Sequence, residues 1–188
     1  MLDVRKMKKN IVIFATSCIA FFIACEEKDT TFLIADEKIG KLDKISLVRD
    51  LDLIYENDSL VRDTLSSRIS TQRKIKIYEK GGQHLLTLKP TADSIPKIEH
   101  VTIEDPRFET AHGIGLKSTF KDIQAFYEIK KTVTTLSSVV IFPKASNLYF
   151  TIDKSELPSN LRYSNADIDA VQIPDDAKIK YLMIGWEQ

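Results

Sequence analysis

The feature that most constrains the fold of this chain is a pattern that occurs twice along it. Segment Ser46–Tyr55 aligns with Ser118–Tyr127 without gaps, an Ile-Gly pair precedes each segment, and apolar runs follow in a shared order. The further aligned pairs are Ile39-Gly40 with Ile114-Gly115, Ile75–Tyr78 with Val139–Phe142, Leu86–Leu88 with Phe150–Ile152, and Ile98–Ile103 with Ile179–Trp186. Because the order is shared, we expect a duplicated body, with a first α/β unit at 39–110 and a second at 111–188.

Each unit is predicted to begin with a short helix. Apolar residues recur at helical spacing after Ser46 and after Ser118, and either serine hydroxyl can cap a first turn. Gly81-Gly82 marks a tight hairpin between two apolar runs, and Val101 and Ile103 alternate with polar residues as in a half-buried strand. The fold class predicted is therefore α+β: two tandem helix-strand-strand-strand units that form an antiparallel sheet, with the short helices packed on one face.

Two polar segments are expected to lack strands. Asn57–Arg73 is rich in Ser, Thr, Asp and Arg, which favours a helix extension followed by a loop. Pro158–Pro174 has only scattered apolar residues and is expected to be a long loop. Long loops are often functional, so this one is a candidate contact for a ligand or partner. A mobile insertion without a function is the alternative.

The first 24 residues resemble a secretory signal in composition. Arg5, Lys6, Lys8 and Lys9 precede an apolar stretch, Ile11–Ala24, which is too short for a spanning helix. Phe22-Ile23-Ala24-Cys25 closes the stretch, and a cysteine directly after the cleavage point can carry a lipid. We therefore expect residues 1–24 to be a lipoprotein signal peptide, Cys25 to be lipidated, and 25–38 to be a lipid-anchored tether.

Alternatives to this assignment stay open in the sequence. Cys18 could be the lipid site, although cleavage there leaves a very short apolar core. Ordinary signal cleavage near Ala24 would leave no anchor. Translation could begin at Met1 or at Met7, since Met7-Lys8-Lys9-Asn10 is itself a complete basic start.

Composition limits the classes of partner. Removing residues 1–24 leaves 23 basic against 26 acidic residues, so no strongly basic patch predicts nucleic-acid binding. Both cysteines, Cys18 and Cys25, lie in or directly after the signal region. The mature chain then has no internal disulfide and depends on a hydrophobic core.

The motifs for catalysis are incomplete. Ser118-Thr119-Phe120-Lys121 matches the S-x-x-K element of penicillin-recognising serine enzymes, but their S-D-N and K-T-G elements are missing. Ser46 and Arg49 occupy the equivalent positions of the first unit, which favours a repeated helix start. In Ser94-Ile95-Pro96-Lys97 the proline disfavours the helical turn that the motif requires. We expect no catalytic residue in either segment.

Metal and phosphate motifs are also incomplete. His84, His100 and His112 lack the spacing of a zinc site and are expected to be surface residues. Gly113-Ile114-Gly115 lacks the third glycine of a phosphate loop. The late aspartates lack the spacing of a calcium loop, so no metal or cofactor is expected. These aspartates are Asp167, Asp169, Asp175 and Asp176.

Two resemblances carry expectations of location and fold. Phe22-Ile23-Ala24-Cys25 followed by acidic residues resembles the lipoproteins of Bacteroidetes, in which this pattern is associated with display at the cell surface. A glycine, a short helix ending at Tyr55 or Tyr127, and then strands resembles the small lipoproteins of the barrel-assembly machinery and the tandem-repeat β-lactamase inhibitor proteins. The chain departs from the assembly lipoproteins in lacking Gly-Xaa-Pro after the helix. No functional residue follows from these resemblances.

Together these features resemble an uncharacterised family of bacterial envelope lipoproteins, and we expect a lipid-anchored protein placed at the outer membrane, on its periplasmic side or at the cell surface. Its expected role is a non-catalytic binding or scaffolding module. The membrane would be reached through Cys25, and the partner would be an envelope protein or a glycan. The alternative is an envelope hydrolase with a site assembled from dispersed residues, such as His112 with aspartates of the late loop.

Overall fold

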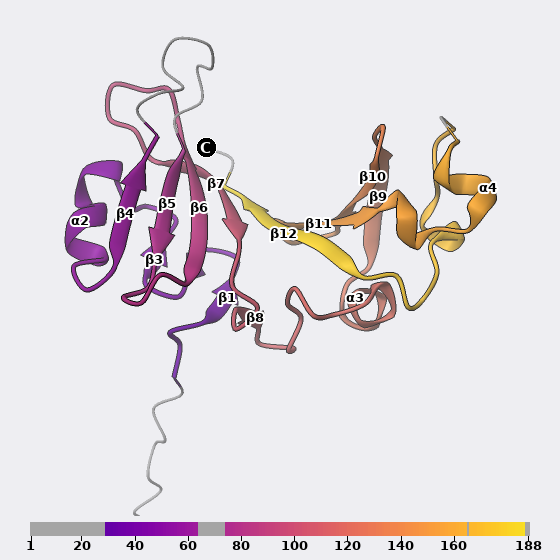
Figure 1. Ribbon diagram of the computed structural model, residues 1–188, viewed down its shortest axis with the longest axis horizontal. Coiled ribbons are helices and arrows are strands. Elements are labelled where there is room, and N and C mark those ends of the chain that lie inside the picture. Colours follow the sequence, from indigo (N-terminus) through magenta and orange to yellow (C-terminus); the bar gives the residue numbers. More distant parts are fainter. Residues whose placement is uncertain (1–28, 64–73, 165, 187–188) are drawn as a thin grey trace, which may run out of the picture.

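The computed structural model describes residues 29–63, 74–164 and 166–186. Within these ranges the chain forms two β-sheets, one of eight strands and one of four, with a few short helices (Figure 1). No helix in the described ranges is long and apolar enough to cross a membrane. Residues 1–28, which contain Cys18, Cys25 and the expected signal peptide, lie outside the described residues.

The larger sheet is antiparallel throughout and has the order β4-β5-β6-β7-β12-β11-β10-β9. β7 and β12 pair at its centre, so the first half of the chain supplies one side of the sheet and the second half the other. The bounds are β4 Ser59–Arg62, β5 Ile75–Tyr78, β6 His84–Pro90, β7 Ile98–Ile103, β9 Ile129–Thr134, β10 Ser138–Pro143, β11 Leu148–Asp153 and β12 Ile179–Gly185.

The smaller sheet has the order β3-β2-β1-β8 and is mixed, because β1 and β8 run parallel. Its strands are β1 Leu33–Ala35, β2 Lys38–Ile39, β3 Leu42–Asp43 and β8 Glu109–Thr110. β1 lies inside the segment expected to be a tether, and Ile34 at its centre is only 3% exposed. The folded body therefore begins before the expected boundary at residue 39.

The helices are short and start elsewhere than the sequence predicts. α2 spans Leu51–Ile54 after the 3-10 turn η1 Val48–Asp50, and α3 spans Phe120–Phe126. Neither serine caps a helix: Ser46 Oγ accepts from the Asp43 N–H, and Ser118 Oγ accepts from the Gly115 N–H. Each serine thus closes the turn before its helix, because a hydroxyl three residues after an N–H can satisfy it locally. The N-cap of α3 is Thr119, one residue after the predicted cap Ser118.

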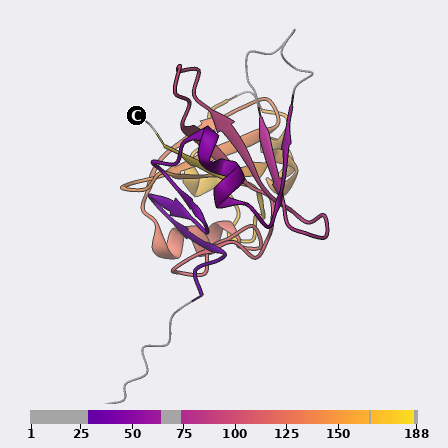
Figure 2. The same cartoon turned by 90° about the vertical axis from the view of Figure 1, so that its left-hand side faces the viewer.

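One continuous core fills the space between the large sheet and its cover. Ile77, Leu86 and Val101 point into it from the first half, and Val139, Phe150 and Leu182 from the second. Helix α3 covers the second half of this face below β12, and α2 lies beside the first half (Figure 1). Figure 2 views the molecule from the α2 side and shows the small sheet next to that helix. Leu51 of α2 and Phe120 and Ile123 of α3 are buried in this core, whereas Phe126 of α3 is 53% exposed.

The predicted fold class, α+β with helix-strand-strand-strand units, is wrong. The described chain is mostly β, with twelve strands in two sheets and helices of at most seven residues. Asn57–Arg73 contains strand β4 in place of a helix extension, with residues 64–73 outside the described part. β4 and β9 escaped prediction because both are edge strands with many exposed polar residues, and the small sheet because its strands have two or three residues.

The strand order is mirrored about the central β7–β12 pair. Runs that align in the sequence occupy mirrored strands: β5 and β10, β6 and β11, β7 and β12. β7 and β12 also begin with similar burial patterns, and each has a register shift near its start, opposite Pro90 and Ile152 respectively. If the two halves are superposed on these register shifts, Pro90 corresponds to Ile152. The sequence alignment instead pairs Leu88 with Ile152, so the two comparisons differ by two residues. Duplication is a proposal that this arrangement supports.

Candidate functional site

The large sheet has one buried face and one face that no described helix covers, which we call the open face. Alternate residues of each strand point to it, as the half-buried Thr87, Thr102 and Met183 do in adjoining registers. In Figure 1 this is the side of β12 opposite α3. Its members are Lys76, Thr87, Lys89, Glu99, His100, Thr102, Lys131, Val133, Val140, Phe142, Tyr149, Thr151, Tyr181 and Met183.

A β-bulge brings two polar residues of β7 to the open face. Lys89 pairs with His100 and Pro90 pairs with Ile98, so Glu99 is an extra residue in the ladder. Such an insertion breaks the alternation and re-aims a side chain. Glu99 and His100 accordingly lie within reach of each other, with 3.4 Å between Glu99 Oε1 and His100 Nε2.

From this bulge a chain of contacts crosses the open face. Lys89 Nζ lies 3.2 Å from Glu99 Oε2, and His100 Nδ1 lies 3.2 Å from the Tyr149 hydroxyl. The Tyr149 ring stacks on Phe142 at 5.6 Å between centroids, and Lys131 Nζ lies 5.0 Å from the Phe142 centroid. The chain runs from β6 to β9, so side chains from both halves form one surface.

Gly185 lies beside the central contact. It lies on β12, between the strands that carry His100 and Tyr149, and pairs with His100. A Cβ at this position would stand 3.4 Å from His100 Nδ1 and 3.5 Å from Tyr149 Cε1. These are ordinary van der Waals distances, so the Cβ of an alanine would fit beside the two rings.

Tyr149, the tyrosine in this series of contacts, is held in its protonated form. Burial and the charge of Glu99 both raise the pKa of the Tyr149 hydroxyl. A phenol that stays protonated donates a hydrogen bond well and attacks an electrophile poorly. The Glu99–His100–Tyr149 contacts are therefore suited to recognition more than to nucleophilic catalysis.

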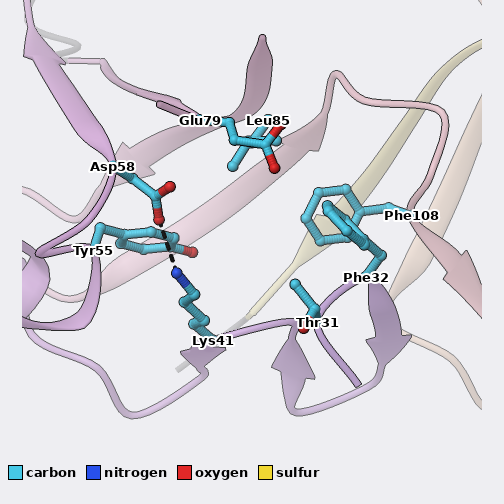
Figure 3. Close-up of a pocket in the computed structure, with 8 residues that line it drawn as sticks. All are labelled: Thr31, Phe32, Lys41, Tyr55, Asp58, Glu79, Leu85 and Phe108. Carbon is cyan, nitrogen blue, oxygen red and sulfur yellow. Dashed lines mark hydrogen bonds and ion pairs between the residues drawn. The ribbon is translucent and has the colours of Figure 1, made fainter. Parts of the chain in front are cut away.

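A small pocket lies on the covered side of the large sheet, opposite the open face. It is formed where α2 and the small sheet meet the β5–β6 hairpin (Figure 3). It encloses about 40 Å³. Phe32, Phe108 and Leu85 form its apolar side, while Tyr55, Asp58 and Lys41 form its polar side. Thr31 and Glu79 complete the lining.

The Tyr55 hydroxyl is the least satisfied group of this pocket. Tyr55 is 3% exposed, and its hydroxyl has no hydrogen-bond partner among the described residues. Figure 3 shows this hydroxyl directed toward the interior of the pocket. Burial, followed by the charge of Asp58, raises the pKa of Tyr55, so the group carries a proton to donate. A buried hydroxyl without a partner is costly, and an occupant of the pocket would relieve that cost.

Ion pairs balance the acidic residues of the pocket. Asp58 Oδ2 accepts from Lys41 Nζ at 2.9 Å. Glu79 accepts from Arg107, which also bonds Asp105 and lies over the Phe32 ring at 4.2 Å. Burial acts to raise the pKa of Asp105, but the hydrogen bonds from Arg107 outweigh it and hold that pKa below its usual value.

The three histidines do not converge. His100 belongs to the open face, His84 stacks on Tyr78 at 4.5 Å, and His112 stacks on Phe126 at 4.8 Å. Among the described residues no carboxylate bonds the His112 ring, so the geometry gives no support to the hydrolase hypothesis. No group of three or more His, Cys, Asp or Glu in the described ranges could hold a metal ion.

The other candidate segments have structural roles. Thr119 and Asp122 cap α3, where Asp122 accepts from both the N–H and the hydroxyl of Thr119, so the S-x-x-K match is part of a helix start. Pro158–Pro174 contains α4 Ser159–Arg162 and the turn η4 Ala170–Gln172. Ile168 from this segment is buried and its backbone bonds Thr132 and Thr134 of β9. Its described part therefore packs on the sheet.

The sequence missed both the open face and the pocket. The open face is built from alternate residues of strands that pair across the two halves, and a register is not readable from one chain. The bulge in β7 leaves a partial signal in the sequence. Glu99 and His100 are two consecutive polar residues between the apolar Ile98 and Val101, which breaks the alternation expected of a strand. The pocket depends on the small sheet, for which the sequence carries little signal.

No family model matches the chain, and no curated protein matches it. A solved structure is similar, that of the uncharacterized protein yfeY from Escherichia coli. The TM-score is 0.55 at 13% identity, with 81% of this chain and 98% of that chain covered. This likeness shows a shared fold.

Proposed function

We propose that the protein is a lipid-anchored, non-catalytic binding protein of the bacterial cell envelope, and that its open face holds a protein partner. The observation that carries the proposal is the chain of contacts from Lys89 to Lys131 across this face. It preorganises aromatic and polar groups from five strands on a side of the sheet that no described helix covers.

The composition of the open face supports a protein as the partner. Tyr, Phe and Met are enriched at the centres of protein interfaces, and charged residues at their rims. Met183 lies on the central strand β12, Tyr149 on the neighbouring β11 and Phe142 on β10, while the exposed Lys131 lies on the edge strand β9. Val133 and Tyr181 remain 41% and 44% exposed on the same face, which leaves apolar area for a partner to bury.

The sequence around Cys25 supports the anchor. A basic start, a short apolar stretch and a cysteine after a small residue are followed by Glu26 and Glu27. A single acyl chain binds a membrane only marginally, whereas two or more hold stably. We infer a lipidated Cys25 at the outer membrane, on its periplasmic side or at the cell surface.

Crosslinking in intact cells tests the open face. The wild-type chain is expected to recover one partner in constant proportion, and Val133→Asp or Tyr181→Ala should reduce that recovery strongly. Val171→Asp and Tyr163→Ala are matched controls, because both residues are 90% exposed and lie outside the open face. Equal recovery by the open-face and control variants would contradict the proposal.

Fatty-acid labelling tests the anchor separately. Labelled palmitate should be incorporated into the wild-type chain and absent from Cys25→Ala. Persistent label in that variant would show that another residue, such as Cys18, carries the lipid.

A further inference from the structure

The pocket of Figure 3 has two unlike sides that face each other across a short gap. Phe32 and Phe108 meet edge to face at 5.1 Å and form an apolar side together with Leu85. The Tyr55 hydroxyl, Asp58 and Lys41 form the other side. An occupant that fits both sides has a small apolar end and a hydrogen-bonding end.

The charges of the pocket favour a neutral occupant. Asp58 is paired with Lys41, and Glu79 with Arg107. Binding an anion or a cation would compete with one of these pairs. A neutral group needs only the hydrogen-bonding groups that remain unused. These are the unpartnered Tyr55 hydroxyl, which can donate, and the remaining lone pairs of the Asp58 carboxylate, which can accept.

We propose that this pocket binds an acetamido group. Its methyl would lie against Phe32, Phe108 and Leu85, its carbonyl oxygen would accept from the Tyr55 hydroxyl, and its N–H would donate to the Asp58 carboxylate. This gives the buried hydroxyl the acceptor it lacks. A volume of about 40 Å³ suits one such group and not a whole sugar ring, so the rest of the ligand stays outside.

An acetamido group can come from an N-acetylated sugar or from an acetylated peptide. Both present the same methyl, carbonyl and N–H, and they differ in what remains outside the pocket. The site is separate from the open face, because it lies between the large sheet and its cover. The proposal therefore goes beyond the protein-binding role and does not depend on it.

Ligand-observed saturation-transfer NMR on the full chain, purified from membranes in detergent, tests the proposal. N-acetylglucosamine and N-acetylglycinamide are the probes, and glucosamine is the probe without the acetyl group. We expect saturation to be strongest at the acetyl methyl and glucosamine not to compete. Stronger binding of the sugar or of the amide identifies the source.

Tyr55→Phe is the informative variant, since it removes only the hydroxyl. The loss of one hydrogen bond should weaken acetamido binding up to about tenfold. Tyr163→Phe, at a 90% exposed tyrosine, is the matched control and should bind as the wild type does. A thermal melt of each variant checks that it is folded.

Three results would overturn the proposal: no saturation with either acetamido probe, equal competition by glucosamine, or equal binding by wild type and a folded Tyr55→Phe variant. The first is the result expected if the pocket holds only water. None of them bears on the crosslinking of the open face, so failure of this site is distinguishable from failure of the protein-binding role.

Discussion

Two tyrosines end the helices of the two halves, and they differ in how deeply their side chains are buried. Tyr55 follows α2, is 3% exposed and has no hydrogen-bond partner among the described residues. Tyr127 follows α3, is half-buried and packs against Phe150, and a contact with Thr110 acts to lower the pKa that burial raises. Burial raises the pKa of both. Similar sequence positions thus produce one hydroxyl that is buried without a described partner and one that belongs to a half-buried side chain.

The difference comes from what covers each half of the sheet. The second half is covered by α3 and by the segment after β11, which inserts Leu157, Ile168 and Ile173 into the core. The first half is covered by the shorter α2 and by the small sheet, whose junction leaves the pocket of Figure 3. Two similar four-strand arrays therefore differ in their covers, and the pocket of the first half lies where its cover meets the sheet.

The largest expected effect tests whether the two halves unfold together. Leu51 of α2 and Ile123 of α3 are both fully buried in one continuous core. Truncating either to alanine should lower the free energy of unfolding by about 4 kcal/mol, because apolar contacts are lost and a cavity remains. We expect a single urea transition that shifts in both variants. Loss of only half the circular dichroism signal in a separate transition would show that the halves are independent.

A smaller loss of stability is expected when Gly40 of the first half or the aligned Gly115 of the second half is replaced by alanine. A Cβ on Gly40 would lie 2.4 Å from Thr31 O, and one on Gly115 would lie 2.6 Å from Phe108 O. Only Gly40 also has a positive φ, of 54°. Gly40→Ala should cost about 3 kcal/mol and Gly115→Ala about 2 kcal/mol, since the first adds backbone strain to the clash. Urea unfolding measures both, and a larger cost at Gly115 would contradict this account.

These pairs show what a sequence can predict for such a chain. The apolar runs of β5, β6, β7, β10, β11 and β12 were identifiable because most of their buried residues alternate or cluster. Strand β4 was not, because Ser59, Val61 and Arg62 are exposed at a sheet edge. The helix starts were misplaced because Ser118 and Thr119 are both good caps, and only the surrounding turn decides between them. The orphaned Tyr55 hydroxyl depends on the small sheet and had no signal in the sequence.

The next largest effect on stability is expected from the residues that cap the starts of α2 and α3. Asp122 accepts from the Thr119 N–H at 2.8 Å and the Thr119 hydroxyl at 2.9 Å, whereas Asp50 makes no side-chain bond at the start of α2. Asp122→Ala should lower the free energy of unfolding by about 1 kcal/mol and Asp50→Ala by much less. Thermal or urea unfolding at neutral pH measures the difference.

The pH dependence of the Asp122 effect is its control. The Thr119 hydrogen bonds lower the pKa of Asp122 below its usual 3.8 in the folded state. The carboxylate therefore contributes its stability above the unfolded pKa, and that contribution is lost as the pH falls through the lower folded pKa. The gap between wild type and Asp122→Ala should narrow in acid. A constant gap would mean that the charge of Asp122 plays no part in the cap.

The smallest expected effect returns to the two tyrosines. Tyr127→Phe should lower the free energy of unfolding by about 0.5 to 1 kcal/mol, because it removes the contact of its hydroxyl with Thr110. Tyr55→Phe should leave the free energy unchanged or raise it by up to about 1 kcal/mol, since the hydroxyl it removes is buried and unpartnered. Urea unfolding of the two variants without added ligand measures the contrast. If Tyr55→Phe were as destabilising as Tyr127→Phe, the hydroxyl would already have a partner in the pocket, and an acetamido group would have to displace it.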